Sequence, residues 1–143
     1  MIKNIEPQLA PAAPGLQMQV IQAGRKICDI AMGDTYPYYD LASLTKIIFT
    51  TQVMAKAFDE GKWKLDTKVS DVISWFPYSK VLIKDLLTHS SGLIWWVPIY
   101  KHLDLNNSSI ADRWQAASRI ISELPLENEK SDESVYSDIG FIL

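Results

Sequence analysis

The segment from Ser43 to Glu60 carries its apolar residues at the spacing of an α-helix. They come in three adjacent pairs that are one or two helical turns apart: Ile47 and Ile48, Val53 and Met54, and Ala57 and Phe58. This periodicity predicts a helix with one apolar face. Gly61 follows directly and fits the position at which a helix commonly ends in a left-handed residue. Such a helix has to bury its apolar face against other elements, which the rest of the sequence must provide.

The segments on either side of this helix predict a mixed chain of strands and helices. Pro7 to Gly15 holds three prolines and reads as an extended lead-in. Alternating apolar residues from Leu16 to Ala31, interrupted at Gly24-Arg25, predict two antiparallel strands joined by a hairpin turn. Further helices are expected over 66–75, 83–88, 110–123 and 139–143, with an irregular aromatic loop over 95–107. No segment has the composition of a linker, so we expect one domain over residues 1–143.

The composition excludes several classes of function. With 143 residues, 48% hydrophobic and 22% charged, the chain has the make-up of an ordinary globular domain. Its net charge of −3 offers no basic patch for a phosphate backbone, so nucleic acid is not an expected partner. The lone cysteine, Cys28, allows no intrachain disulfide, and His89 and His102 are too few and too far apart for a zinc site. We therefore expect no metal and no cofactor.

The sequence also carries expectations about location. No stretch reaches the roughly 18 apolar residues of a membrane-spanning helix, so no transmembrane segment is predicted. Residues 1–15 hold Lys3 as their one basic residue and no apolar run, which is unlike a secretory signal. On this ground we expect a cytoplasmic protein. A leader removed before this start would instead place it in the periplasm or outside the cell.

Ser43 and Lys46 form a Ser-x-x-Lys pair at the start of the predicted helix, where residues three apart share a face. A serine hydroxyl becomes an effective nucleophile when a base takes its proton. Lysine serves as that base when burial or a neighbouring cation lowers its pKa, and the first turn of a packed helix can supply both influences. The amide of Ser43 would also help to hold an oxyanion. Taken alone, the pair is more typical of an N-cap serine beside a solvated lysine.

Two further stretches follow this pair in the chain. One is the run Leu-Leu-Thr-His-Ser-Ser-Gly-Leu from Leu86 to Leu93, and the other is Tyr136-Ser137-Asp138. In this order and at these spacings, the three stretches resemble the serine hydrolases that comprise class C β-lactamases, penicillin-binding proteins and family VIII esterases. The resemblance extends from Ser43 to Gly140, about two thirds of the chain.

The resemblance implies a β-lactamase/transpeptidase-like fold of the α/β (α+β) class, represented by an N-terminal β-hairpin and a helical subdomain. It implies that Ser43 is the nucleophile and Lys46 the general base, and that Tyr136 shares the proton transfers. A phenol needs a close ammonium before it can act as a base. Asp138 stands where penicillin-recognising members usually have asparagine, and we expect it to orient Lys46 or substrate. His89 is expected to be structural, because the run that contains it is mainly architectural in this family.

One motif of this family is absent. Neither Lys-Thr-Gly nor its His-x-Gly variant occurs in the sequence. In the family that motif lies on an edge strand, which also supplies the second oxyanion amide. We therefore expect the chain to be an N-terminal portion of a longer hydrolase, or a truncated one. Losing one oxyanion donor costs on the order of 10²–10³ in rate, so the isolated chain is expected to be poorly stable or inactive.

The resemblance predicts a serine hydrolase that forms an acyl-enzyme. Its substrates would be small-molecule or peptide-like acyl compounds: esters, amides, D-alanyl peptides or β-lactams. We favour esters or small amides, because an ionised Asp138 accepts hydrogen bonds but cannot donate them. Trp95 and Trp96 follow Gly92 closely and are candidates for the rim of the substrate cleft, with packing on the helical subdomain as the alternative. The competing hypothesis is an inactive truncated relative that binds a ligand or a partner.

Overall fold

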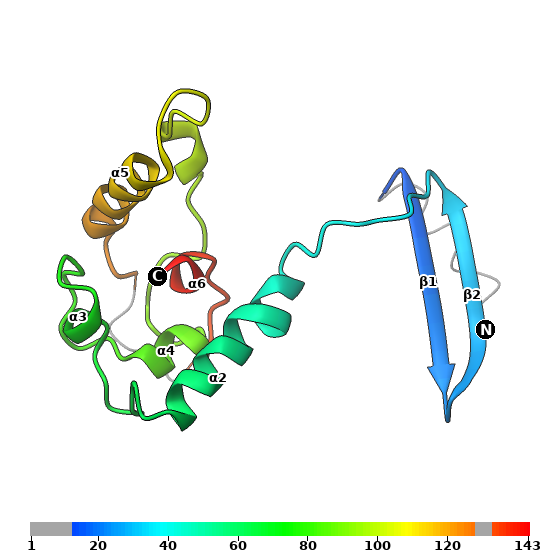
Figure 1. The fold of residues 1–143 in the computed structure, drawn as a ribbon, viewed down its shortest axis with the longest axis horizontal. Helices are drawn as coiled ribbons and strands as arrows, with labels where there is room; N and C mark the ends of the chain where they lie inside the picture. The colour runs from blue at the N-terminus through cyan, green and yellow to red at the C-terminus, as the bar shows by residue number, and fades with distance from the viewer. Residues whose placement is uncertain (1–12, 128–132) are drawn as a thin grey trace. The chain divides into compact units, whose positions relative to one another are not determined.

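The computed structural model describes residues 13–127 and 133–143 (Figure 1). The chain divides into two compact units, one up to Ala42 and one from Ser43 to Leu143. The expected single domain over residues 1–143 stays a prediction. Most of the proline-containing lead-in, residues 7–12, lies outside the described residues. The α/β fold class is confirmed, since the described residues form a two-stranded antiparallel sheet followed by helices.

The first unit is a β-hairpin. Strand β1 (Gly15–Gln22) pairs antiparallel with β2 (Arg25–Gly33), with an irregularity in the register after Val20. The turn consists of Ala23 and Gly24, whose φ angles are 48° and 74°. A two-residue turn with two positive φ angles matches the right-handed twist of a hairpin. The turn therefore lies one residue earlier than the predicted Gly24-Arg25, because Arg25 already pairs with Gln22 as part of β2.

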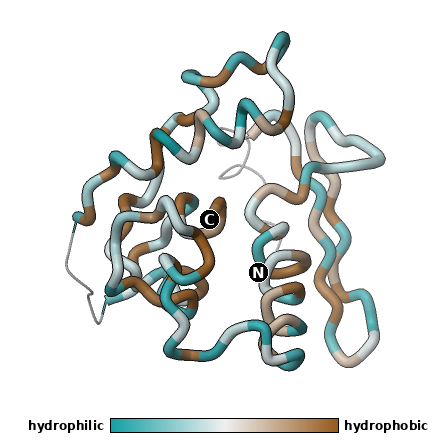
Figure 2. Tube along the Cα trace, turned by 60° about the vertical axis from the view of Figure 1, so that its left-hand side comes forward, coloured by the Kyte–Doolittle hydropathy of each residue, from teal (hydrophilic) through white to brown (hydrophobic). Residues whose placement is uncertain are grey.

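The predicted helix over 43–60 forms, but it is not regular throughout. It contains a π-helical turn, η2 (Lys46–Thr50), which is followed by α2 (Thr51–Asp59). The Thr51 amide donates to the carbonyl of Lys46, five residues back, which inserts one extra residue into the turn. Hydrophobic residues recur along this helix (Figure 2). Single π turns are frequent at functional sites, and this one begins at a candidate site residue.

Gly61 ends α2 as the sequence predicts. Its φ is +72°, and its amide donates to the carbonyl of Phe58, while the Lys62 amide donates to that of Ala57. These two bonds make a Schellman motif, in which a left-handed residue lets the chain satisfy carbonyls that the helix end leaves open.

The remaining elements are short, except for one helix. They are α3 (Val69–Val72), α4 (Ile83–Leu87), the 3-10 helix η3 (Ile99–His102), α5 (Ile110–Glu123) and α6 (Ile139–Ile142). The helix expected over 66–75 is wrong in extent. Lys68 forms a bridge with Leu82, and the Val69 amide donates to the Val81 carbonyl, so long-range pairing holds the start of that segment extended. The loop expected over 95–107 contains η3, and α5 has the predicted bounds.

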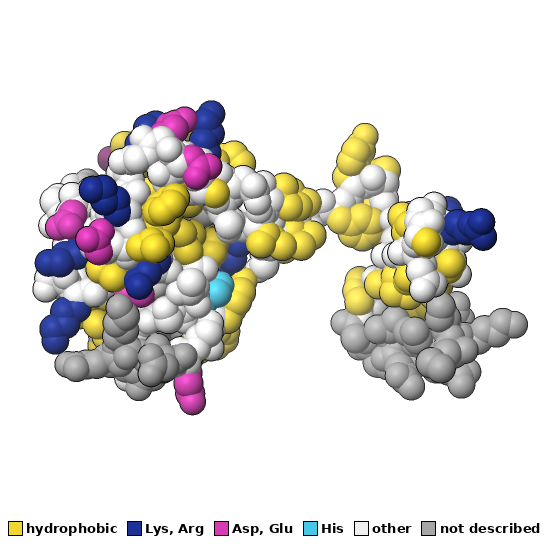
Figure 3. Space-filling model, turned by 90° about the horizontal axis from the view of Figure 1, so that it is seen from below, with side chains coloured by type: hydrophobic (Ala, Val, Ile, Leu, Met, Phe, Trp, Pro, Cys, Tyr) yellow, Lys and Arg dark blue, Asp and Glu magenta, His cyan; other side chains and the backbone are white. Residues whose placement is uncertain are grey.

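The core of the second unit lies between these elements. Its most buried side chains come from α5, α6 and α3: Ile121, Ile139 and Val69. Large hydrophobic side chains also reach the surface of this unit beside charged ones (Figure 3). In the part of the chain that the structure describes, no helix is both long and apolar enough to cross a membrane.

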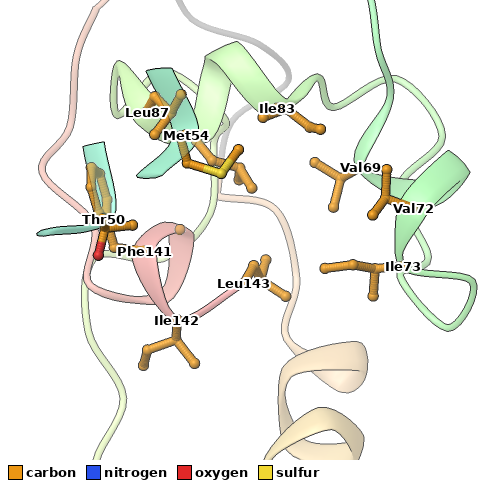
Figure 4. A pocket seen from close by; sticks show the side chains of 12 residues that line it. Thr50, Met54, Val69, Val72, Ile73, Ile83, Leu87, Phe141, Ile142 and Leu143 are labelled. Atoms are coloured by element: carbon orange, nitrogen blue, oxygen red, sulfur yellow. The ribbon is translucent and has the colours of Figure 1, made fainter. Parts of the chain in front are cut away.

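A pocket of about 290 Å³ opens beside α6 (Figure 4). Met54 of α2, Val69 of α3, Leu87 of α4 and Phe141 of α6 contribute to its lining. The lining side chains are hydrocarbon, except for the thioether sulfur of Met54 and the hydroxyl of Thr50. The side chains that line the pocket include no acid or base. We therefore regard the pocket as part of the packing around α6 and not as the candidate site.

Candidate active site

Ser43 and Tyr136 are 93 positions apart in the sequence, and the fold brings them into contact. The Oγ of Ser43 and the hydroxyl of Tyr136 share a hydrogen bond of 2.7 Å. Ser43 precedes the helix, and its carbonyl accepts from the Lys46 amide at 3.1 Å, so it lies at the positive end of the helix dipole. The preceding Ala42 has a φ of 44°, an uncommon conformation for a residue with a Cβ, which is typical of functional sites.

Lys46 pairs with Asp138. The Nζ of Lys46 lies 2.6 Å from Oδ1 of Asp138, and the two side chains are 19% and 35% exposed. The same ammonium lies 5.2 Å from the ring centroid of Tyr136 and 5.8 Å from that of Phe141. Cations within about 6 Å of an aromatic ring are attracted by its negative face. Ser43, Lys46, Tyr136 and Asp138 therefore form one cluster.

The surroundings of Lys46 favour its charged form. Partial burial works to lower its pKa, but hydrogen bonds to Asp138 and Tyr136, with their charges, outweigh burial and raise the pKa above its ordinary value. The lysine is an ammonium at neutral pH in this arrangement. A lysine that acts as a general base needs a lowered pKa, so the raised pKa of Lys46 is opposite to what its predicted role as base requires. Asp138 is the carboxylate that pairs with Lys46, and the expectation that it orients Lys46 or substrate stays a prediction.

The segment that carries Tyr136 is attached to residues 89–95 by backbone hydrogen bonds. The amides of Val135 and Ser137 donate to the carbonyl and to Nδ1 of His89, at 2.8 and 3.1 Å. The amide of Asp138 donates to the Trp95 carbonyl at 2.8 Å. The run from Leu86 to Leu93 and the stretch from Tyr136 to Asp138, which the sequence treats as two motifs, are thus parts of one structure.

Ser137 lies between two candidate site residues, and its own role was not predicted from the sequence. Its side chain is 1% exposed, and its hydroxyl donates to the carbonyl of Ile94 at 2.9 Å. The same oxygen accepts from the amide of Gly140 at 3.2 Å, which satisfies a donor in the first turn of α6. A buried serine with both bonds fixes the backbone between Tyr136 and Asp138. The available signal was a small polar residue two positions before the apolar segment 139–143.

Trp95 and Trp96 lie next to this cluster through their backbone. Their ring centroids are 6.0 Å apart with an interplanar angle of 32°, and the side chains are 58% and 40% exposed. The carbonyl of Trp95 accepts a hydrogen bond from the Asp138 amide, so Trp95 and Trp96 lie at the edge of the site. Their rings contact each other, and the part of the chain that the structure describes shows no ring contact between them and Tyr136.

Replacing Asp138 with asparagine should lower the pKa of Lys46. The neutral amide removes the charge and the strong hydrogen bond that now hold this pKa above 10.5. A raised lysine pKa adds stability that is present below the unfolded value and is lost as the pH rises through the folded value. Asp138→Asn should therefore flatten the loss of stability above pH 10.5. NMR titration of the Lys46 side chain, with urea unfolding at several pH values, measures both effects.

The exposed pair of Lys26 and Asp29 in β2 provides the control for this substitution. Its two atoms are also 2.6 Å apart, but both side chains are 51% exposed. Asp29→Asn should leave the titration of Lys46 unchanged, because exposed ion pairs contribute little and Asp29 is not among the groups that act on the pKa of Lys46. An unchanged titration of Lys46 in Asp138→Asn would contradict the prediction.

The described residues offer no group of three or more His, Cys, Asp or Glu side chains that could hold a metal ion. The chemistry available to the cluster is that of a hydroxyl, a phenol, an ammonium and a carboxylate. This set is typical of nucleophilic catalysis, in which a base and a third group activate a serine.

Comparison with known proteins places the cluster in a wider context. The family model for Beta-lactamase matches residues 1–143. The N-acetylmuramyl-L-alanine amidase of Bacillus subtilis (strain 168) is 26% identical over 165 residues, covering 97% of this chain and 37% of the relative. A "Putative D-alanyl-D-alanine carboxypeptidase" of Escherichia coli O157:H7 is 26% identical over 169 residues, covering 100% of this chain and 39% of the relative. The chain thus spans less than two fifths of the length of these relatives.

A second protein of that name, from Escherichia coli (strain K12), is 29% identical over 114 residues, covering 73% of this chain and 26% of the relative. The family match spans both units of the chain. It therefore includes the hairpin as well as the cluster around Ser43.

Proposed function

Because this chain belongs to the β-lactamase family, we propose that Ser43 attacks acyl substrates and forms an acyl-enzyme that water then hydrolyses. The relatives are named for hydrolysis of amide or peptide bonds. The observation that carries the proposal is the 2.7 Å hydrogen bond between Ser43 Oγ and the Tyr136 hydroxyl. A nucleophile within hydrogen-bond reach of a proton acceptor, which is itself beside a third group, is the signature of an activated serine.

In this proposal Tyr136 takes the proton from Ser43 and Lys46 acts as the charged partner. The Tyr136 hydroxyl is the group in contact with Ser43, while the Lys46 ammonium lies near the phenol ring and would stabilise a phenolate. The sequence-based hypothesis gave the role of base to Lys46. The raised pKa of Lys46 favours the division made here, in which the lysine keeps its proton while it is paired with Asp138.

The remaining steps use the same groups. The Ser43 amide, at the N-terminal end of the helix, would donate to the oxyanion that forms when the acyl carbonyl is attacked. Protonated Tyr136 would give its proton to the leaving group, and would later accept one from the water that attacks the acyl-enzyme. The proton of Ser43 thus departs with the leaving group, and the proton taken from water passes from Tyr136 to Ser43 Oγ when the acyl group is released.

Esters and small amides fit the site better than β-lactams or D-alanyl peptides. An ionised Asp138 offers only acceptors, and one of its oxygens is already bound by Lys46. It cannot donate to the side-chain carbonyl of a peptide-like substrate. The exposed rings of Trp95 and Trp96 would provide apolar contact area for the acyl group.

A fluorophosphonate probe tests the proposal. The probe should modify the 143-residue chain once, with the adduct on Ser43 by mass spectrometry of peptides, and Ser43→Ala should abolish the adduct. Labelling is a more sensitive measure than turnover, because a single acylation event is retained. Ser90→Ala serves as the matched control, since Ser90 lies outside the cluster and should label like the parent chain.

The alternative function is that of a non-catalytic binding module. The observation in its favour is the pairing of Lys46 with Asp138, which keeps the lysine charged and leaves catalysis dependent on Tyr136 as the proton acceptor. A chain that is folded by circular dichroism, binds a peptidoglycan fragment, and never labels at Ser43 would support the module and overturn the enzyme.

A further inference from the structure

His89 contacts the backbone on both sides of Tyr136. Its carbonyl accepts from the Val135 amide at 2.8 Å, and its Nδ1 accepts from the Ser137 amide at 3.1 Å. One residue thus fixes the peptide units immediately before and after the side chain that contacts Ser43. His89 is expected from the sequence to be structural, but the residues that it would contact were not predicted.

The imidazole ring of His89 also packs on the phenol ring. The two centroids are 4.7 Å apart with an interplanar angle of 34°, and the ring of Phe141 in α6 lies 5.0 Å away at 32°. The backbone of His89 has a φ of 57°. Histidine tolerates this left-handed region better than most residues with a side chain, and asparagine tolerates it well.

The hydrogen bond from the Ser137 amide determines the form of the imidazole. An Nδ1 that accepts from a backbone N–H has no proton of its own, so the ring is neutral with its proton on Nε2. Protonation at Nδ1 would set one donor against another and break the bond to Ser137. The amide of Ser137, a residue that is 1% exposed, would then lose its partner.

The charged and titratable groups that face His89 come from two elements. They are Lys46 of η2, and Tyr136 and Asp138 of the segment before α6, while α6 itself presents the uncharged ring of Phe141. Burial, followed by the positive charge of Lys46, lowers the pKa of His89, against the opposing effects of Asp138 and of the Ser137 amide. The neutral form is therefore the one present at neutral pH.

We propose that neutral His89 is a positioning residue that holds Tyr136 against Ser43, and that protonation of His89 releases Tyr136 and switches the site off in acid. The kinetic part of this inference rests on the proposed function, and the structural part does not. When the folded state lowers the pKa of a histidine, the folded arrangement is most stable at a pH above the pKa of the unfolded state. That stability is lost as the pH falls through the pKa of the folded state.

The structural part can be tested by NMR on the ¹⁵N-labelled chain without any substrate. Between pH 8 and pH 4.5, the imidazole nitrogens should show a bare Nδ1 and a protonated Nε2 at the start, and the Ser137 amide signal should move with the midpoint of the His89 titration. Exchange of the Ser137 amide with solvent should accelerate through the same midpoint. A Ser137 amide that ignores the titration of His89 would overturn the inference.

Two substitutions test the kinetic part. In His89→Asn, the Oδ1 atom can replace Nδ1 as the acceptor, the left-handed backbone is tolerated, and nothing titrates. Its labelling rate at pH 7.5 should stay within about threefold of the parent chain, and the acid loss that follows His89 should disappear. His89→Ala removes the acceptor and should lower the labelling rate by roughly tenfold or more at every pH, with an unsatisfied amide left behind.

The outcomes separate the two proposals. If His89→Asn loses labelling in acid with the same midpoint as the parent chain, protonation of a group other than His89 causes the loss, and the inference fails. If His89→Ala is folded by circular dichroism and labels like the parent chain, it fails as well. If Ser43 never labels but the Ser137 amide follows His89, the proposed function fails while the positioning role stands.

Discussion

Replacing Tyr136 with phenylalanine should slow the acylation of Ser43 by roughly 10²–10⁴-fold, the usual contribution of general acid–base catalysis. The substitution removes one oxygen atom, the hydroxyl that lies 2.7 Å from Ser43 Oγ. The ring remains and can keep its packing on His89. Tyr136 is 48% exposed, so loss of the hydroxyl should leave the fold intact. The rate of fluorophosphonate labelling, followed over time, measures the effect.

Tyr100→Phe is the matched control for this experiment. Tyr100 lies in η3 with a similar exposure of 54%, and it is not part of the cluster around Ser43. Its variant should label at the parent rate. Equal labelling of Tyr136→Phe and the parent chain would mean that Tyr136 is not the proton acceptor, and would contradict the proposed division of roles between Tyr136 and Lys46.

The parts of the fold that depend on neighbouring residues were predictable from the sequence. Helix α5 has the predicted bounds because it begins at a local signal, the reciprocal hydrogen bonds between Ser109 and Asp112. The end of α2 at Gly61 depends on a glycine that accepts a positive φ. In both places the residues that define the boundary lie within four positions of it.

The parts that depend on distant residues were not predictable in the same way. The helix expected over 66–75 is limited to Val69–Val72 by pairing with Val81 and Leu82, which local periodicity does not report. The π turn at the start of the long helix is also invisible to periodicity, because one extra residue leaves the apolar pattern recognisable.

The candidate site shows the same division between local and distant signals. Order along the chain predicted that Ser43, Lys46 and Tyr136 belong together, and the geometry brings them into one cluster. The direction of the Lys46 pKa was not predictable from its own motif, because it is set by Asp138, 92 positions away. The position of Tyr136 depends likewise on His89, through hydrogen bonds that connect two separate motifs.

The largest effect on stability is expected for Ile121→Ala, which should lower the free energy of unfolding by about 2–5 kcal/mol. Ile121 lies in α5 with 0% of its surface exposed, within the core cluster. Truncation removes buried methyl groups and leaves a cavity that surrounding side chains fill only in part. The midpoint of urea unfolding should fall while the slope stays unchanged, since the surface exposed on unfolding is nearly the same.

Ile110→Ala, in the same helix, provides the internal comparison. Ile110 is 82% exposed at the first position of α5, so the same chemical change should alter the free energy of unfolding by less than about 0.5 kcal/mol. The contrast between two isoleucines in one helix separates burial from helix propensity, because both substitutions introduce alanine. If the two variants unfold at the same urea concentration, α5 does not pack on this core in solution. The anchoring of residues 135–138, which depends on the same core through Ile139, would then need another explanation.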